Sequence, residues 1–123
     1  SLLQFFAEVV HGYTQSLEGV NFENLTIDQR SLGDLARILR GTKLLLKHPD
    51  GRDRVKKFES FSNNPADREF FDFDDGHTRG RYSVAQFFLE KYGKRLDFPR
   101  FHCLRFFNRK SGATSLIPFE FFH

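Results

Sequence analysis

The sequence predicts an α+β fold in which a small β-barrel carries one inserted unit made of a hairpin and a helix. Apolar residues recur at helical spacing up to Gly41, and short strands separated by turns follow it. A capped helix beginning at Ser83 interrupts these strands. So few strands bury a core best when their sheet closes into a barrel.

Two helices are expected before residue 42. Residues 2–17 carry apolar side chains at 2, 3, 5, 6, 9, 10 and 13, which is the stripe of a helix that packs on a neighbour. Residues 18–25 are expected to form a loop. Thr26 and Gln29 then have the spacing of a capping box and predict a second scaffold helix, which ends at Gly41.

Residues 43–61 predict a β-hairpin, because β-compatible stretches flank the Pro-Asp-Gly turn at residues 49–51. This turn would bring His48 near Arg54 on the returning strand. The Asn-Asn-Pro sequence at residues 63–65 is expected to break the chain.

A second, smaller hairpin is expected where charged residues alternate with Phe between 69 and 73, before an Asp-Gly turn. It leads into the helix whose start carries the capping-box pair Ser83 and Gln86 and whose stop is Gly93. Phe87, Lys91 and Tyr92 lie along neighbouring faces of this helix. A phosphate there would meet both positive charge and a hydroxyl group.

Residues 102–107 and 114–119 predict two more strands, joined by the polar loop 108–113. Cys103, the one cysteine, excludes an internal disulfide and is expected in the core. A reducing compartment fits, so we expect a cytoplasmic location, with the nucleus also open. No stretch approaches the ~20 apolar residues of a membrane helix.

The net charge of +3 permits a polyanionic partner without requiring one. Residues 37–57 carry eight Lys and Arg residues, whereas residues 67–75 are acidic, so the basic half is the expected nucleic-acid face. The 17 Phe residues, with no Trp or Met, must mostly be core, which leaves few rings as ligand platforms.

The same sequence leaves two other functions open. A hard-metal or nuclease site is conceivable at Asp72, Asp74, Asp75 and His77, but a solvated hairpin is favoured because no second carboxylate cluster follows. We expect no bound metal and no cofactor. The other alternative is an interaction domain whose Phe-rich C-terminal edge docks on a larger protein, since the chain starts without methionine and is expected to be part of something longer.

Several motifs follow one another in a recognisable order. Residues 83–92 read S-V-A-Q-F-F-L-E-K-Y, residues 98–104 contain F-P and C-L, and residues 117–120 read I-P-F-E. Further matches in the same order lie upstream, at Asp28-Gln29-Arg30, Gly41, His48, Pro65-Ala66 and Phe71. This order resembles the PAZ domain of Argonaute and Piwi proteins over almost the whole chain.

The resemblance implies one PAZ domain over residues 1–123, built as an OB- or SH3-like barrel with an inserted αβ appendage. Residues 1–41 would be N-terminal helices, 42–62 and 94–123 barrel strands, and 63–93 the appendage. Such a domain is a non-catalytic, monomeric RNA-binding module that anchors the single-stranded 3′ end of a small guide RNA during RNA interference. It contacts the other domains of a parent protein, and the resemblance leaves open whether that parent is itself an endonuclease.

The resemblance leaves some alternatives open. One is a Dicer-type PAZ domain that binds duplex 3′ overhangs. The RNA class, whether siRNA, miRNA or piRNA, and the preference for 2′-hydroxyl or 2′-O-methyl ends also stay open.

Carried over by position, Phe71 would be the aromatic plate for the last nucleotide. Phe87, Lys91 and Tyr92 would line the phosphate between the last two nucleotides. Phe87 stands where the family usually has Tyr, so it keeps the ring but lacks the O–H donor.

The first hairpin and the last strand would complete the site by the same resemblance. His48, Arg54 and Lys56 would flank the phosphate, and Leu116 and Ile117 would bound the sugar. Lys56 stands where a second phosphate-binding Tyr is common, so a point charge replaces a phenol there.

Overall fold

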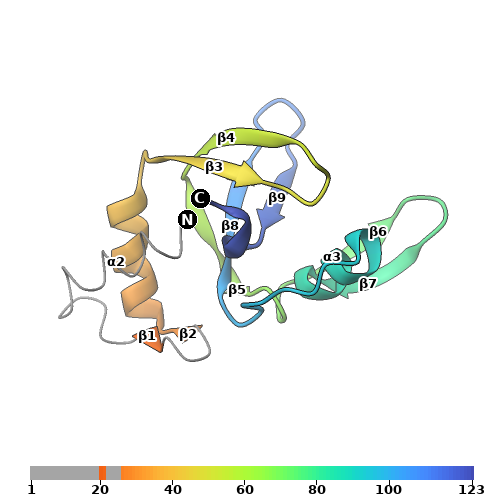
Figure 1. Ribbon diagram of the computed structural model, residues 1–123, viewed down its shortest axis with the longest axis horizontal. Coiled ribbons are helices and arrows are strands. Elements are labelled where there is room, and N and C mark those ends of the chain that lie inside the picture. The colour runs from red at the N-terminus through yellow and green to blue at the C-terminus, as the bar shows by residue number, and fades with distance from the viewer. Residues whose placement is uncertain (1–19, 22–25) are drawn as a thin grey trace.

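The computed structural model describes residues 20–21 and 26–123, so the helix predicted for residues 2–17 lies outside the described part. Figure 1 shows α2 on one side, the appendage of β6, β7 and α3 on the other, and the remaining long strands between them. The elements are β1 (Val20–Asn21), β2 (Thr26–Ile27), α2 (Gln29–Leu39), β3 (Lys43–Lys47), β4 (Asp53–Lys57), β5 (Ser60–Pro65), β6 (Phe70–Asp74), β7 (Arg79–Ser83), α3 (Val84–Tyr92), β8 (His102–Phe107), β9 (Thr114–Ile117) and the 3₁₀ helix η1 (Phe119–Phe121).

The cap of helix α2 lies two residues after the predicted one, at Asp28. The Asp28 carboxylate, and not Thr26, caps it by accepting a hydrogen bond of 2.8 Å from the Ser31 N–H. Asp is the better capping residue, and Thr26 is instead paired with Asn21 in a short antiparallel ladder, so the predicted loop at residues 18–25 contains a strand. The predicted stop is confirmed, since Gly41 follows the helix with φ +79°.

The first hairpin is confirmed over β3 and β4, where Leu46 pairs with Arg54 close to the turn. The returning strand ends at Lys57 and not at residue 61, because the buried Phe58 turns the chain into the core. Strand β5 then starts a different sheet. The Asn-Asn-Pro sequence at residues 63–65 belongs to β5 and is no chain break, since an irregular register with β8 accommodates it.

The described strands form four antiparallel sheets, β1-β2, β3-β4, β5-β8-β9 and β6-β7. The ladder therefore does not close into the expected barrel within residues 20–21 and 26–123. Between β3 and the C-terminal end there is only an isolated bridge, Leu46 to Phe122, and two hydrogen bonds between Leu45 and His123 of 3.2 and 2.8 Å. The strand predicted over residues 114–119 ends at Ile117, because η1 follows Pro118. The domain is a small α+β fold with antiparallel sheets.

The second hairpin is confirmed as β6 and β7, in which Phe71 pairs with Tyr82. Its turn is held by the Asp75 carboxylate, which accepts hydrogen bonds from the N–H groups of His77 and Thr78 at 2.9 and 2.6 Å. Gly76 takes φ +89°, which an L side chain rarely adopts.

The local signals for α3 are also confirmed. The Ser83 hydroxyl accepts from the Gln86 N–H at 3.1 Å, and the Gln86 side-chain oxygen accepts from the Ser83 N–H at 2.9 Å. Gly93 ends the helix at φ +65°. No helix in the described residues is long and apolar enough to cross a membrane.

The core lies between α2, β3, β8 and the C-terminal segment. Phe101, Phe122, Leu35 and Leu104 are fully buried in it. Cys103 is fully buried as predicted, and burial raises the pKa of its thiol well above the usual range.

We expect Ser83→Ala to lower the free energy of unfolding by about 0.5–2 kcal/mol, because the Gln86 N–H at the start of α3 loses its partner. Urea unfolding measures this change. The matched control is Ser115→Ala, an exposed serine within β9, which should stay within about 0.5 kcal/mol of wild type. Equal losses in both variants would contradict the capping role.

Candidate functional site

A cleft of about 500 Å³ is lined by residues of the β3-β4 hairpin, β9 and the appendage. Six of the nine predicted site residues line it. The lining residues are His48, Arg54, Phe71, Asp72, Val84, Phe87, Phe88, Thr114, Ser115, Leu116 and Ile117.

The appendage supplies an aromatic wall to this cleft. Phe71, half-buried on β6, meets the ring of Phe87 edge-on at a centroid distance of 5.2 Å. Phe87 in turn contacts the ring of Tyr92 at 6.2 Å. The edge contact fixes the orientation of Phe71 and leaves part of its surface open to a ligand.

Lys91 covers the outer side of the same aromatic cluster. Its ammonium lies 5.4 Å from the Phe87 ring centroid and 5.5 Å from that of Phe73, so it forms cation–π contacts with both. The predicted grouping of Phe87, Lys91 and Tyr92 is therefore present. Lys91 lines a neighbouring hollow with Tyr82, and neither Lys91 nor Tyr92 is among the residues that line the cleft itself.

The hairpin supplies His48, whose side chain is 11% exposed. Its ring contacts Tyr92 edge-on at 5.3 Å and Phe88 at 5.6 Å. The Asp50 N–H donates to Nδ1 at 3.0 Å. A neutral ring that accepts at Nδ1 carries its proton on Nε2, so Nε2–H is its remaining donor.

Burial lowers the pKa of His48, and the positive charges of Arg54 and Lys91 lower it further, while the Asp50 carboxylate opposes them. Arg54 is ion-paired with Asp50 at 2.7 Å, which holds the guanidinium at the cleft wall. The hairpin thus brings the Arg54 guanidinium and the His48 imidazole to the cleft wall.

Lys56 does not lie with the other predicted residues. It shares a face of β4 with Arg54, but it stands two residues, about 6.6 Å, further along the strand. Its ammonium lies 5.0 Å from the ring centroid of Phe106, in a different groove. The prediction that Lys56 flanks the same phosphate as Arg54 is therefore not supported by its position.

The sequence patterns did not indicate two hydroxyl groups in the cleft, those of Thr114 and Ser115. Thr114 and Ser115 begin β9 directly before Leu116, and their place in that strand was the available signal. Asp72 lines the cleft as well, and Arg81 lies 3.7 Å from its carboxylate and offsets part of the charge.

The acidic turn of the appendage has a structural role. Its Asp75 carboxylate accepts hydrogen bonds from Thr78 and His77, and these bonds lower its pKa. The Asp74 carboxylate accepts from the Gly76 N–H at 3.0 Å. Among residues 20–21 and 26–123 no group of three His, Cys, Asp or Glu side chains is arranged to hold a metal ion.

Comparisons with known proteins identify similar domains. Residues 14–123 match the family described as PAZ domain. The chain is 32% identical over 126 residues to an Argonaute protein of Schizosaccharomyces pombe, covering 98% of this chain but spanning only 13% of that protein.

Solved structures from Drosophila are similar too. One is an Argonaute PAZ domain in complex with 3′-end 2′-O-methylated RNA, with TM-score 0.58 and 26% identity over 70% of each chain. Another, described as the basis for 3′-end recognition of nucleic acids by the Argonaute 2 PAZ domain, has TM-score 0.59 and 26% identity over 75% of this chain and 72% of that one.

The electrostatics of His48 predict a pH dependence of stability. Because its folded-state pKa is lowered, the stability from the neutral ring is complete above the unfolded pKa of about 6.5 and is lost as the pH falls below it. Between about pH 7.5 and about pH 5, wild type should lose more unfolding free energy than His48→Gln. The control is His77→Gln, in an exposed turn, which should lose as much unfolding free energy over this pH range as wild type does. If His48→Gln also loses as much as wild type, the assignment to His48 is refuted.

Proposed function

Because this chain belongs to the PAZ domain family, we propose that its cleft binds the single-stranded 3′ end of a small guide RNA in RNA silencing. The domain acts as a binding module and performs no catalysis itself. The observation that carries this proposal is the half-buried ring of Phe71, which faces the same cleft as Arg54 and His48.

Phe71 supports the proposal because single strands bind through aromatic stacking on exposed bases. The ring is neither fully buried nor free, since Phe87 contacts its edge and the cleft leaves the rest accessible. We infer that the last nucleotide stacks on Phe71.

The hairpin wall suits a phosphate group. Arg54 offers several N–H donors in one plane, and Asp50 already orients it, so little side-chain freedom remains to be lost on binding. His48 lies on the same wall and adds an imidazole as a second polar group. Tyr92, in ring contact with His48, places its phenol beside this wall, and we infer that it donates to the phosphate between the last two nucleotides.

The remaining wall suits a terminal sugar. Ile117, Val84 and Phe88 are buried and give the cleft an apolar floor, and Thr114 and Ser115 add hydroxyl groups at its side. Pockets of about 300–1,000 Å³ enclose small molecules, so a cleft of about 500 Å³ fits a terminal nucleotide better than a strand that continues through it.

In this proposal residues 42–62 and 94–123 form one wall, as an OB- or SH3-like barrel would, and the appendage at 63–93 forms the other. The domain works as a monomer within a larger Argonaute protein. It contacts the other domains of that protein.

The test compares linear RNA with circular RNA of the same sequence. Wild type should prefer the linear strand, because only a free end fits the cleft. Phe71→Ala should largely remove this preference, since a lost base–aromatic stack costs roughly 1–3 kcal/mol. Fluorescence anisotropy titrations measure both affinities.

Phe70→Ala is the matched control, because Phe70 is the adjacent residue on β6, is 49% exposed and is absent from the cleft lining. It should keep the wild-type preference. Thermal melting of both variants checks that each is folded. Equal binding of linear and circular RNA by wild type would exclude 3′-end recognition.

A further inference from the structure

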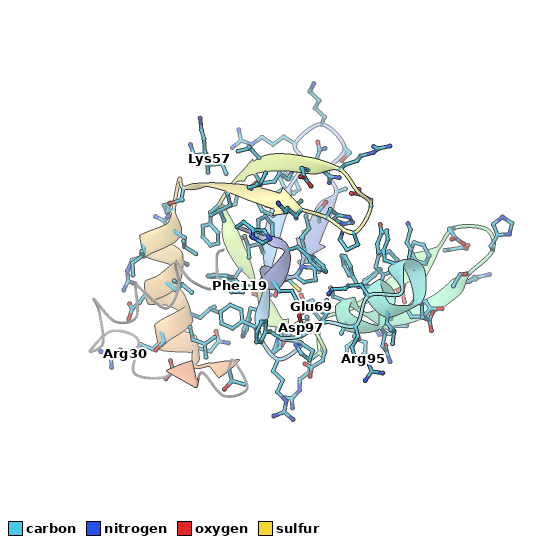
Figure 2. All side chains as sticks on the ribbon, in the orientation of Figure 1. Arg30, Lys57, Glu69, Arg95, Asp97 and Phe119 are labelled. Atoms are coloured by element: carbon cyan, nitrogen blue, oxygen red, sulfur yellow. The ribbon has the colours of Figure 1, made fainter. Side chains whose placement is uncertain are left out.

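A second groove, of about 620 Å³, lies along β4 and shares no lining residue with the cleft. It is formed by the end of α2, by β4 and the segment after it, and by the end of β8. Figure 2 shows Lys57, one of its residues, near α2 and on the far side of β4 from the appendage. We call this surface the basic groove.

Four cations line the basic groove, Arg40, Lys56, Lys57 and Arg109, against the single carboxylate of Glu59. Glu59 accepts a hydrogen bond of 3.4 Å from the Phe107 N–H. None of these cations is ion-paired with another described residue. Among the described residues the lining of the basic groove therefore carries an excess of positive charge, which attracts a polyanion.

Aromatic surface is exposed among these cations. Phe107 is 52% exposed in the groove, and Val55, which also lines it, is 63% exposed. Beside it the ring of Phe106 is buried and forms the cation–π contact with Lys56. Unpaired cations around an exposed ring are the combination that binds phosphates and stacks a base of single-stranded nucleic acid.

We propose that the basic groove is a second binding site for single-stranded RNA, in which the four cations contact phosphates and a base stacks on Phe107. An acidic peptide would satisfy the charge but not the exposed ring, so RNA is favoured. Strand β4 joins the two sites, because Arg54 lines the cleft and Lys56 lines the basic groove. One RNA strand can therefore extend from the cleft into the basic groove. This path of the RNA rests on the proposed 3′-end function.

The experiment uses linear oligouridines of about 4 and about 16 nucleotides, the range of site sizes for small single-strand binding domains. Anisotropy titrations of the full chain at several salt concentrations give both affinities. Wild type should bind the longer strand more tightly. Lys57→Ala/Arg109→Ala should remove this gain without weakening the short strand, and should reduce the slope of log K against log salt by about 1.4, or about 0.7 per lost phosphate contact.

The ring has its own test. Phe107→Ala should weaken binding of the long strand roughly 5- to 150-fold, as for one lost base stack, and leave the short strand unchanged. Its side chain is exposed, so the fold should persist, and thermal melting confirms this.

The matched control is Arg95→Ala/Arg100→Ala, which removes the same charge at two exposed positions outside both sites; Figure 2 shows Arg95 near the appendage. This control should keep the wild-type length dependence. An equal loss in the control would mean diffuse charge attraction and would overturn the proposal, as would an unchanged length dependence in Lys57→Ala/Arg109→Ala.

Two further arms separate the alternatives. If polyglutamate of equal charge displaces the long strand from wild type as well as RNA does, the groove takes acidic peptides and the proposal is wrong. Phe71→Ala should keep the length-dependent gain while losing the preference for a free 3′ end. A wild type without end preference but with a groove-dependent gain would refute the 3′-end function and leave the basic groove standing.

Discussion

The spacing of the cleft walls depends on the ring of Phe88. This buried ring contacts His48 at 5.6 Å, Tyr92 at 5.4 Å and Phe121 at 5.3 Å. The rings come from the first hairpin, α3 and η1, which are far apart in the sequence. Aromatic contacts of this kind have preferred geometries, so they hold the appendage at one distance from the hairpin tip. This distance sets the separation of the two cleft walls.

Features encoded by neighbouring residues were predictable. The capping box of Ser83 and Gln86 and the stop at Gly93 involve contacts within one helical turn, so their sequence pattern is sufficient. The start of α2 was missed because two capping residues compete there. Thr26 has the right spacing, but its pairing with β1 takes it out of reach, and Asp28 remains.

Features that depend on distant partners were not predictable in the same way. The Asn-Asn-Pro sequence is typical of a turn, and only its pairing with β8 makes it part of a strand. The alternation of side chains along β4 places Arg54 and Lys56 on one face of the strand. It does not predict that the Lys56 ammonium packs on the ring of Phe106. The family resemblance assigns roles by the order of residues along the chain. The position of Lys56 shows that this order does not determine which side chains a residue contacts.

The pair of hydrogen bonds between Leu45 and His123 has a mechanical consequence. A force that pulls His123 away from the domain acts first on these two bonds, and through them on β3, three residues before His48. The C-terminal residues therefore brace the strand that leads into the hairpin wall of the cleft.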